Sequence, residues 1–149
     1  MRIERYGVVP DSGGAGRHRG GLAYVREYEL LAARATLTIR TDRRDHPPYG
    51  LDGGEPGAPS GNVVVSGGTT RELPTMPMHA FTLEQGDRFT HASAGGGGFG
   101  DPFERDPAAV LDDVLDGKVS VTAARDRYGV VLADGGVDVE ATRELRGDG

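Results

Sequence analysis

The sequence contains no cysteine, so disulfide bonds and thiolate metal ligands are excluded. It has no apolar run long enough to span a bilayer. No basic segment followed by an apolar stretch opens the chain, so the pattern of a secretory signal is missing. From these absences we expect a cytoplasmic protein with no membrane partner.

A basic surface is missing as well. The formal net charge is −6 at pH 7, and the whole excess of acidic side chains lies after Gly100. Because neutralisation of phosphates dominates affinity for nucleic acids, a chain without a basic stripe is a poor nucleic-acid binder. We therefore expect no nucleic-acid partner, and we interpret the acidic end as a solvated helical face.

Glycine is abundant, with 25 of the 149 residues, against about 7% in average proteins. Glycines gathered between patterned apolar segments predict many tight turns in an ordered, β-rich fold, whereas scattered glycines would indicate disorder. The clusters are Gly13-Gly14-Ala15-Gly16, Gly20-Gly21, Gly53-Gly54, Gly67-Gly68, residues 95–98 and Gly135-Gly136.

Strands are predicted where apolar and polar residues alternate. We expect the second and third strands to pair tightly through residues 31–34, and the last two to form a hairpin around residues 84–87. The expected strands are residues 2–9, 22–30, 35–39, 62–66, 79–83 and 89–91.

Two further features belong to this part of the chain. Arg26 alone breaks the apolar side of the second strand, which is formed by Leu22, Tyr24, Tyr28 and Leu30. Residues 42–61 are rich in proline and glycine and predict a long loop, and loops of this length are usually functional or packed against something.

After Gly100 the apolar spacing becomes helical. Residues 130–132 predict one more short strand. Three helices are expected. The first runs from its N-cap Asp106 to Gly117, the second from Ser120 to Gly129, and the third from Asp138 to Arg146. The predicted fold class is α+β. Residues 1–100 form a β-rich body of antiparallel hairpins with glycine-rich loops, and residues 101–149 form a short helical tail packed on the body as one domain.

Residues 95–100 match the spelling of a dinucleotide-binding glycine motif. That motif must open a helix directly after a strand, whereas here Asp101-Pro102 intervenes and the next helix starts only near Pro107. We therefore do not predict a nucleotide site. Two interpretations of this segment remain. It is either a crowded turn that only glycine fits, or a nest of backbone N–H groups that faces an anion or a neighbouring chain.

No histidine has the spacing of a metal site, because none is paired with another histidine or a helical carboxylate at two or four residues. We expect no metal site, and we expect His79 and His91 to be hydrogen-bonded structural residues on strand faces. His46 lies in the long loop and is kept as a candidate for a residue that faces a substrate or an anion. No nucleophile elbow is present, so we assign no catalytic residue.

Two pairs of arginines lie in loops, namely Arg17 with Arg19 and Arg43 with Arg44. Each pair suits an anionic substrate, because guanidinium groups grip carboxylates and phosphates. Salt bridges on the surface are the alternative for both pairs.

Motifs along nearly the whole chain resemble the C-terminal region of hydantoinase B/oxoprolinase proteins. They run from residues 11–17 through Arg19-Gly20-Gly21-Leu22, Arg26-Glu27-Tyr28, Asp42-Arg43-Arg44, residues 47–51, Gly53-Gly54, Gly86-Asp87 and residues 95–102 to Arg105-Asp106-Pro107, Asp113-Val114, Asp116-Gly117, Val119-Ser120 and Tyr128-Gly129-Val130.

The resemblance implies one part of an ATP-dependent enzyme that opens cyclic amides such as 5-oxoproline or hydantoins; relatives carboxylate ketones. An A-type partner subunit is implied to bind ATP. A divalent metal is implied in the N-terminal part of the B-type subunit, for which this chain has no counterpart. We expect this chain to bind no cofactor and to be inactive alone. It would dock onto a larger B-type fragment that carries the metal site.

Two loops are the candidates for the docking surface or for a surface that faces the active site, residues 42–61 and 95–100. The individual interface candidates are Asp11, Gly13, Gly14, Gly96, Gly97 and Phe99. A stand-alone, non-catalytic interaction domain, a truncated gene remnant and a part of a ketone carboxylase remain as alternatives.

Overall fold

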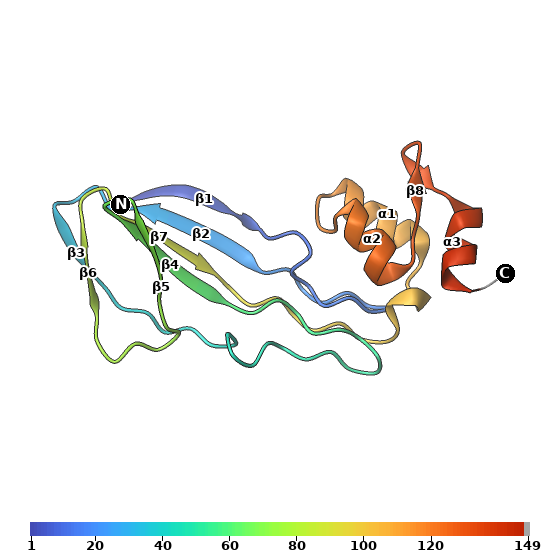
Figure 1. The fold of residues 1–149 in the computed structure, drawn as a ribbon, viewed down its shortest axis with the longest axis horizontal. Coiled ribbons are helices and arrows are strands. Elements are labelled where there is room, and N and C mark those ends of the chain that lie inside the picture. Colours follow the sequence, from blue (N-terminus) through green and yellow to red (C-terminus); the bar gives the residue numbers. More distant parts are fainter. Residues whose placement is uncertain (148–149) are drawn as a thin grey trace.

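The computed structural model describes residues 1–147. The molecule is elongated, with β-sheets at one end and helices at the other, joined by long extended segments that run side by side (Figure 1). The strand pairs are antiparallel throughout the described residues. The α+β class expected from the sequence is thereby confirmed.

The main sheet has five strands in the order β1-β2-β7-β4-β5. They are β1 (Arg2–Val8), β2 (Tyr24–Glu29), β7 (Arg88–Ala92), β4 (Gly61–Ser66) and β5 (Thr69–Glu72). The turn between β4 and β5 is made by Gly67 and Gly68, whose positive φ angles of 55° and 78° suit a tight hairpin.

A second sheet pairs β3 (Arg34–Leu37) with β6 (Phe81–Glu84). The expected β2–β3 pair and the expected hairpin around residues 84–87 are therefore wrong. Instead, the β2–β7 ladder bends and continues as the β3–β6 ladder. At the bend, the Leu30 N–H donates to the Asp87 carbonyl (2.9 Å) and the Gly86 N–H donates to the Leu30 carbonyl (2.8 Å).

Apolar side chains from both sheets and their connections form one buried cluster, which consists of Leu30, Ile39, Val64, Leu73 and Leu83. Burial of such side chains contributes about 1.5–3 kcal/mol each relative to full exposure. This cluster holds the sheets together around the bend.

The helical end follows the sequence closely. It comprises the 3-10 helix η1 (Pro102–Glu104), α1 (Pro107–Leu115), α2 (Val121–Tyr128), the two-residue strands β8 (Leu132–Ala133) and β9 (Gly136–Val137), and α3 (Val139–Arg146). The expected N-caps are confirmed, since the side chains of Asp106, Ser120 and Asp138 each accept a backbone N–H from the first turn. None of the helices described here is long and apolar enough to cross a membrane.

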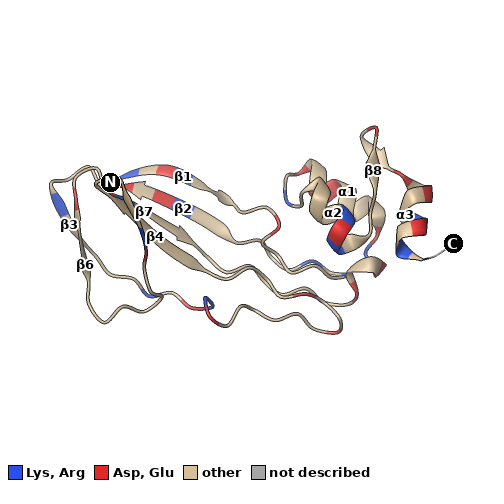
Figure 2. Cartoon of the chain, in the orientation of Figure 1, with Lys and Arg blue, Asp and Glu red and all other residues tan. Residues whose placement is uncertain are grey.

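A second buried cluster lies among these helices. It consists of Ala15, Val110, Val119, Ala123, Ala124, Tyr128 and Val130. Because Ala15 comes from the β-rich part of the chain, the tail packs on that part; whether the two unfold together as one domain stays a prediction. Acidic and basic positions alternate on α2 and α3 (Figure 2).

Between the two ends lies a structure that we call the glycine bundle, formed by residues 12–21, 48–58 and 95–100. Its segments are joined by backbone hydrogen bonds, including Gly14 N–H to Gly96 O (2.8 Å) and Gly98 N–H to Glu55 O (2.9 Å). Residues 95–100 bond to both of the other segments, which also bond directly to each other, as in Glu55 N–H to Ala15 O (2.7 Å). The long loop is thus packed against a partner within its own chain.

Glycine is required in the bundle by the close approach of neighbouring backbones. A Cβ on Gly14 would overlap the Glu55 carbonyl, and one on Gly97 would overlap the Tyr49 carbonyl. The steric crowding expected at residues 95–100 is confirmed, but the prediction that these residues form a turn is wrong. This segment is extended because backbone partners on both sides satisfy its hydrogen bonds, so it does not need to fold back on itself.

Candidate functional site

The predicted anion-facing residue Arg19 is committed to an internal ion pair. Its Nε and Nη2 atoms donate to the two carboxylate oxygens of Asp113 at 2.9 and 3.1 Å. Arg105 donates to the same carboxylate at 2.9 Å. This arrangement, the Asp113 clamp, joins the glycine bundle to α1.

Two opposing effects set the pKa of Asp113. Burial raises this pKa, but the hydrogen bonds and charges of Arg19 and Arg105 outweigh burial and hold it below its ordinary value of 3.8. The carboxylate is therefore ionised at neutral pH and occupies both arginines, so the clamp serves structure.

The other anion-facing candidates do not converge. Arg17 pairs with Glu104 at 3.0 Å on the surface, as the salt-bridge alternative predicted. Arg44 donates to the Leu73 carbonyl at 3.0 Å and pairs with Glu72 at 3.3 Å. Arg43 and His46 are exposed in the long loop. The two arginine pairs thus contact different parts of the fold.

Among the interface candidates, Asp11 faces inward. Its carboxylate accepts the Ser120 N–H at 2.8 Å, at the start of α2. Gly13 and Gly14 are buried, and Gly96 and Gly97 are half-buried. These five residues hold the bundle and the helices together.

Phe99, the last candidate, faces outward. It bridges to Leu51 by backbone pairing and lies 6.2 Å, ring to ring, from His18. Phe99 is 41% exposed and Leu51 57% exposed. We call Leu51, Phe99 and His18 the bundle patch, and it offers apolar contact area to a partner surface.

Strand β1 offers a second such surface. It pairs only with β2 within the described residues, so its other edge has unused backbone donors and acceptors. Its side chains Ile3, Tyr6 and Val8 are all more than half exposed. An exposed apolar edge strand is a template for pairing with another strand.

One row of side chains crosses four strands on a single face of the main sheet. Register pairs Tyr6 with Arg26, Arg26 with His91, and His91 with Asn62. Segment 38–41 covers part of this face and leaves an open cavity of about 300 Å³. We call this cavity the sheet-face pocket; it is lined by Tyr24, Arg26, Tyr28, Thr38, Ile39, Arg40, Thr41, Asn62, Phe89 and His91.

Hydrogen bonds fix the floor of this pocket. The buried Asn62 donates through Nδ2 to Thr41 Oγ1 at 2.9 Å, and its Oδ1 lies 2.9 Å from His91 Nδ1. Because an amide oxygen only accepts, His91 carries a hydrogen on Nδ1. Burial lowers the pKa of His91 from its ordinary 6.5, and the charge of Arg26 lowers it further.

Part of this pocket was visible in the sequence, although its residues were not connected there. The hydrogen-bonded role expected for His91 is confirmed. His79, by contrast, lies before β6, exposed and without a hydrogen-bond partner among residues 1–147, so the same expectation for it is wrong. The signal for the pocket was Arg26, the single charge on the apolar side of its strand.

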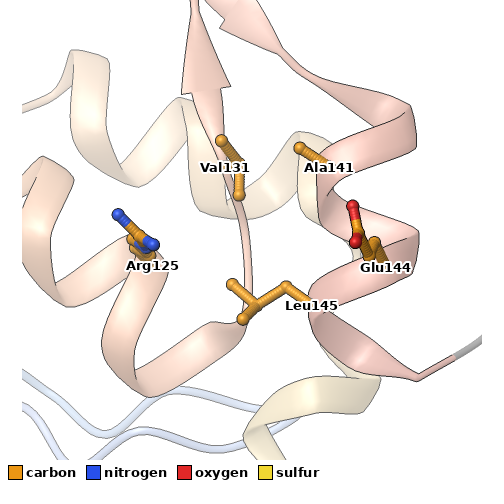
Figure 3. Close-up of a pocket in the computed structure, with 5 residues that line it drawn as sticks. All are labelled: Arg125, Val131, Ala141, Glu144 and Leu145. Carbon is orange, nitrogen blue, oxygen red and sulfur yellow. The ribbon is translucent and has the colours of Figure 1, made fainter.

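The helical end has a shallow groove of about 430 Å³ between α2 and α3. Arg125 and Glu144 lie on its two sides, with Val131 and Leu145 between them (Figure 3). The groove brings together no set of groups suited to catalysis. In the part of the chain that the structure describes, no three His, Asp or Glu side chains gather as metal ligands.

Comparison with known proteins gives consistent matches. Residues 1–102 match the family described as hydantoinase B/oxoprolinase. An uncharacterized protein of Methanocaldococcus jannaschii is 38% identical over 99% of this chain and 26% of its own. The B-type subunit of a putative D-/L-hydantoinase from a Pseudomonas species is 33% identical over 98% of this chain and 25% of its own.

Solved structures agree. The crystal structure of an ATP-dependent caprolactamase from Pseudomonas jessenii superposes with a TM-score of 0.79 at 30% identity, covering 97% of this chain and 26% of its own. A nucleotide-free acetone carboxylase superposes with a TM-score of 0.80 over 98% of this chain and 24% of its own, at 24% identity, which shows the fold alone. This chain spans about a quarter of the length of these curated relatives.

Proposed function

The chain belongs to the hydantoinase B/oxoprolinase family, and from that premise we propose that it is a structural and assembly segment of an ATP-dependent hydrolase of cyclic amides such as 5-oxoproline or hydantoins. One observation carries the proposal: nearly all of the chain aligns with the C-terminal quarter of the B-type subunits. The remaining three quarters of such a protein would supply the reactive centre.

The side chains of this segment support such a division of labour. No group of three side chains that could hold a metal ion is present among residues 1–147. The carboxylate of Asp113 already accepts hydrogen bonds from Arg19 and Arg105. We therefore assign ATP to an A-type partner subunit and the divalent metal to the larger B-type part. No step of the reaction is assigned to a residue of this chain.

The surfaces support docking. The bundle patch and the edge of β1 both expose apolar side chains. Burying such side chains against the larger B-type part would stabilise the complex in proportion to the apolar area removed from water. The long loop thus contributes Leu51 to the interface, and residues 95–100 contribute Phe99.

The test is reconstitution. This chain should co-purify with the larger B-type part and, with the A-type subunit, restore ATP-dependent ring opening of 5-oxoproline or a hydantoin. Each part alone should be inactive. Ring opening by the isolated chain would overturn the proposal, as would full activity of the other two parts without it.

A ketone carboxylase is the second candidate, because the family resemblance includes relatives that carboxylate ketones; the superposition on acetone carboxylase adds agreement of fold only. The same reconstituted complex distinguishes the two. A carboxylase would consume bicarbonate with a ketone, whereas a hydrolase would consume only ATP, water and the cyclic amide. The caprolactamase, the more similar of the two solved structures in sequence, favours the hydrolase.

A further inference from the structure

We propose that the sheet-face pocket binds a small organic carboxylate. This site is separate from the bundle patch and from the Asp113 clamp, and it does not depend on the assembly role proposed above. The proposal rests on three properties of the pocket: its charge, the way its polar groups are held in place, and its apolar walls.

The pocket is positively charged on a chain of net negative charge. Arg26 and Arg40 both line it, and no acidic side chain does. Neither arginine forms an ion pair among residues 1–147, whereas Arg17, Arg19 and Arg44 all do. Two arginines that face a common cavity without a carboxylate partner are suited to an anion from outside.

Arg26 is held in position by aromatic rings and not by an ion pair with an acidic side chain. Its guanidinium carbon lies 5.0 Å from the centre of the Tyr6 ring and 4.8 Å from that of Tyr24. These cation–π contacts orient the planar group while leaving its N–H donors free of a competing carboxylate. On the other side of the row, His91 and Thr41 fix the amide of the buried Asn62.

The walls distinguish an organic carboxylate from an inorganic anion. The rings of Tyr24, Tyr28 and Phe89 line the cavity together with Ile39. Such surfaces stabilise the hydrocarbon part of a ligand, and inorganic phosphate has none. A cavity of about 300 Å³ accommodates a carboxylate on a short or single-ring body. A planar carboxylate also matches the fork of a guanidinium.

The experiment titrates the full chain with benzoate, with neutral benzamide and with inorganic phosphate, following backbone amide signals by NMR. Benzoate should shift signals of β2, β7 and segment 38–41 saturably. Benzamide and phosphate should each bind at least about tenfold more weakly, because one lacks the charge and the other the apolar body.

Variants locate the site. Arg26→Gln and Arg40→Gln should each weaken benzoate binding by about tenfold or more, since each removes a charged donor. Arg40 is exposed outside the strands, so Arg40→Gln tests the site even where Arg26→Gln impairs folding. Arg88→Gln is the control: it lies on the opposite face of the same sheet, beside Glu27, and should leave binding unchanged.

The proposal is overturned if benzoate gives no saturable shifts in the folded chain, or if benzamide or phosphate binds as well as benzoate. Equal losses in Arg40→Gln and Arg88→Gln would also overturn it, because they would show a general effect of surface charge.

Discussion

At the scale of single residues, Asp113 has the largest predicted effect on stability. Asp113→Asn keeps the shape of the side chain but leaves Arg19 and Arg105 without an anion, at 16% and 15% exposure. We expect a loss of about 3 kcal/mol in the free energy of unfolding, measured by urea denaturation at neutral pH. Asp112→Asn, on the exposed side of the same helix, should change it by less than about 0.5 kcal/mol.

The pH dependence of the clamp follows from its lowered pKa. Because the pKa of Asp113 in the folded chain lies below the ordinary 3.8, the charge stabilises the fold above that pH. The stabilisation is lost as the pH falls through the folded pKa. The difference in stability between the native chain and Asp113→Asn should therefore shrink in acid; a difference independent of pH would contradict the clamp.

His91 gives a residue-scale prediction in the pocket. Burial and then the charge of Arg26 lower the pKa of its imidazole, so Arg26→Gln should raise this pKa, as read from an NMR titration of the ring. With the native Arg26, the neutral ring favours folding above the ordinary 6.5, and that contribution is lost as the pH falls through the lower folded pKa. Arg88→Gln, on the other face, should leave the titration unmoved.

Residue roles were the hardest part to predict from the sequence. Arg19 and Asp113 are 94 positions apart, so no local sequence pattern predicts their ion pair. Arg17 was correctly given a surface salt bridge as an alternative, because an exposed arginine commonly finds one. Arg26 stood out as a break in an apolar series. Its place in a pocket depends on His91 and Asn62, which only the pairing of the strands brings beside it.

At the scale of elements, helix boundaries were predictable because their signals are local. A cap such as Ser120 acts within the first turn, and Gly129 ends its helix with a φ of 62°. Strand partners were not predictable, because alternation describes one strand and not its neighbour. Strand β5 was missed because its side chains are polar and exposed, although the Gly67-Gly68 turn beside it was visible.

The glycine bundle supports an element-scale prediction. Gly97→Ala places a methyl group against the Tyr49 carbonyl, and because backbone cannot step aside as a side chain can, we expect a loss of about 2 kcal/mol or more. Gly21→Ala is the matched control, since nothing lies within 4 Å of its added Cβ. Thermal unfolding of the two variants compares them, and equal melting temperatures would show that the packing is looser than described.

At the scale of the whole molecule, the docking surfaces give a test of assembly. Leu51→Asp places a charge in the bundle patch and should abolish co-purification with the larger B-type part, because burying an unpaired carboxylate is costly. Leu115→Asp is the control, since Leu115 is 70% exposed on α1, outside both docking surfaces. Equal retention of the two variants in a pull-down would exclude the bundle patch as an interface.

The glycine bundle also has a consequence for how the chain tolerates insertions and deletions. Many glycines of its three segments lie directly against a particular carbonyl of a neighbouring segment, as Gly14 does against Glu55 and Gly97 against Tyr49. Removing one residue from any of these segments would shift every following glycine away from its packing contact. A bulkier residue would then lie against a carbonyl. We therefore expect the spacing between the sheet end and the helical end to stay constant. Insertions and deletions should fall in the turns outside the bundle segments.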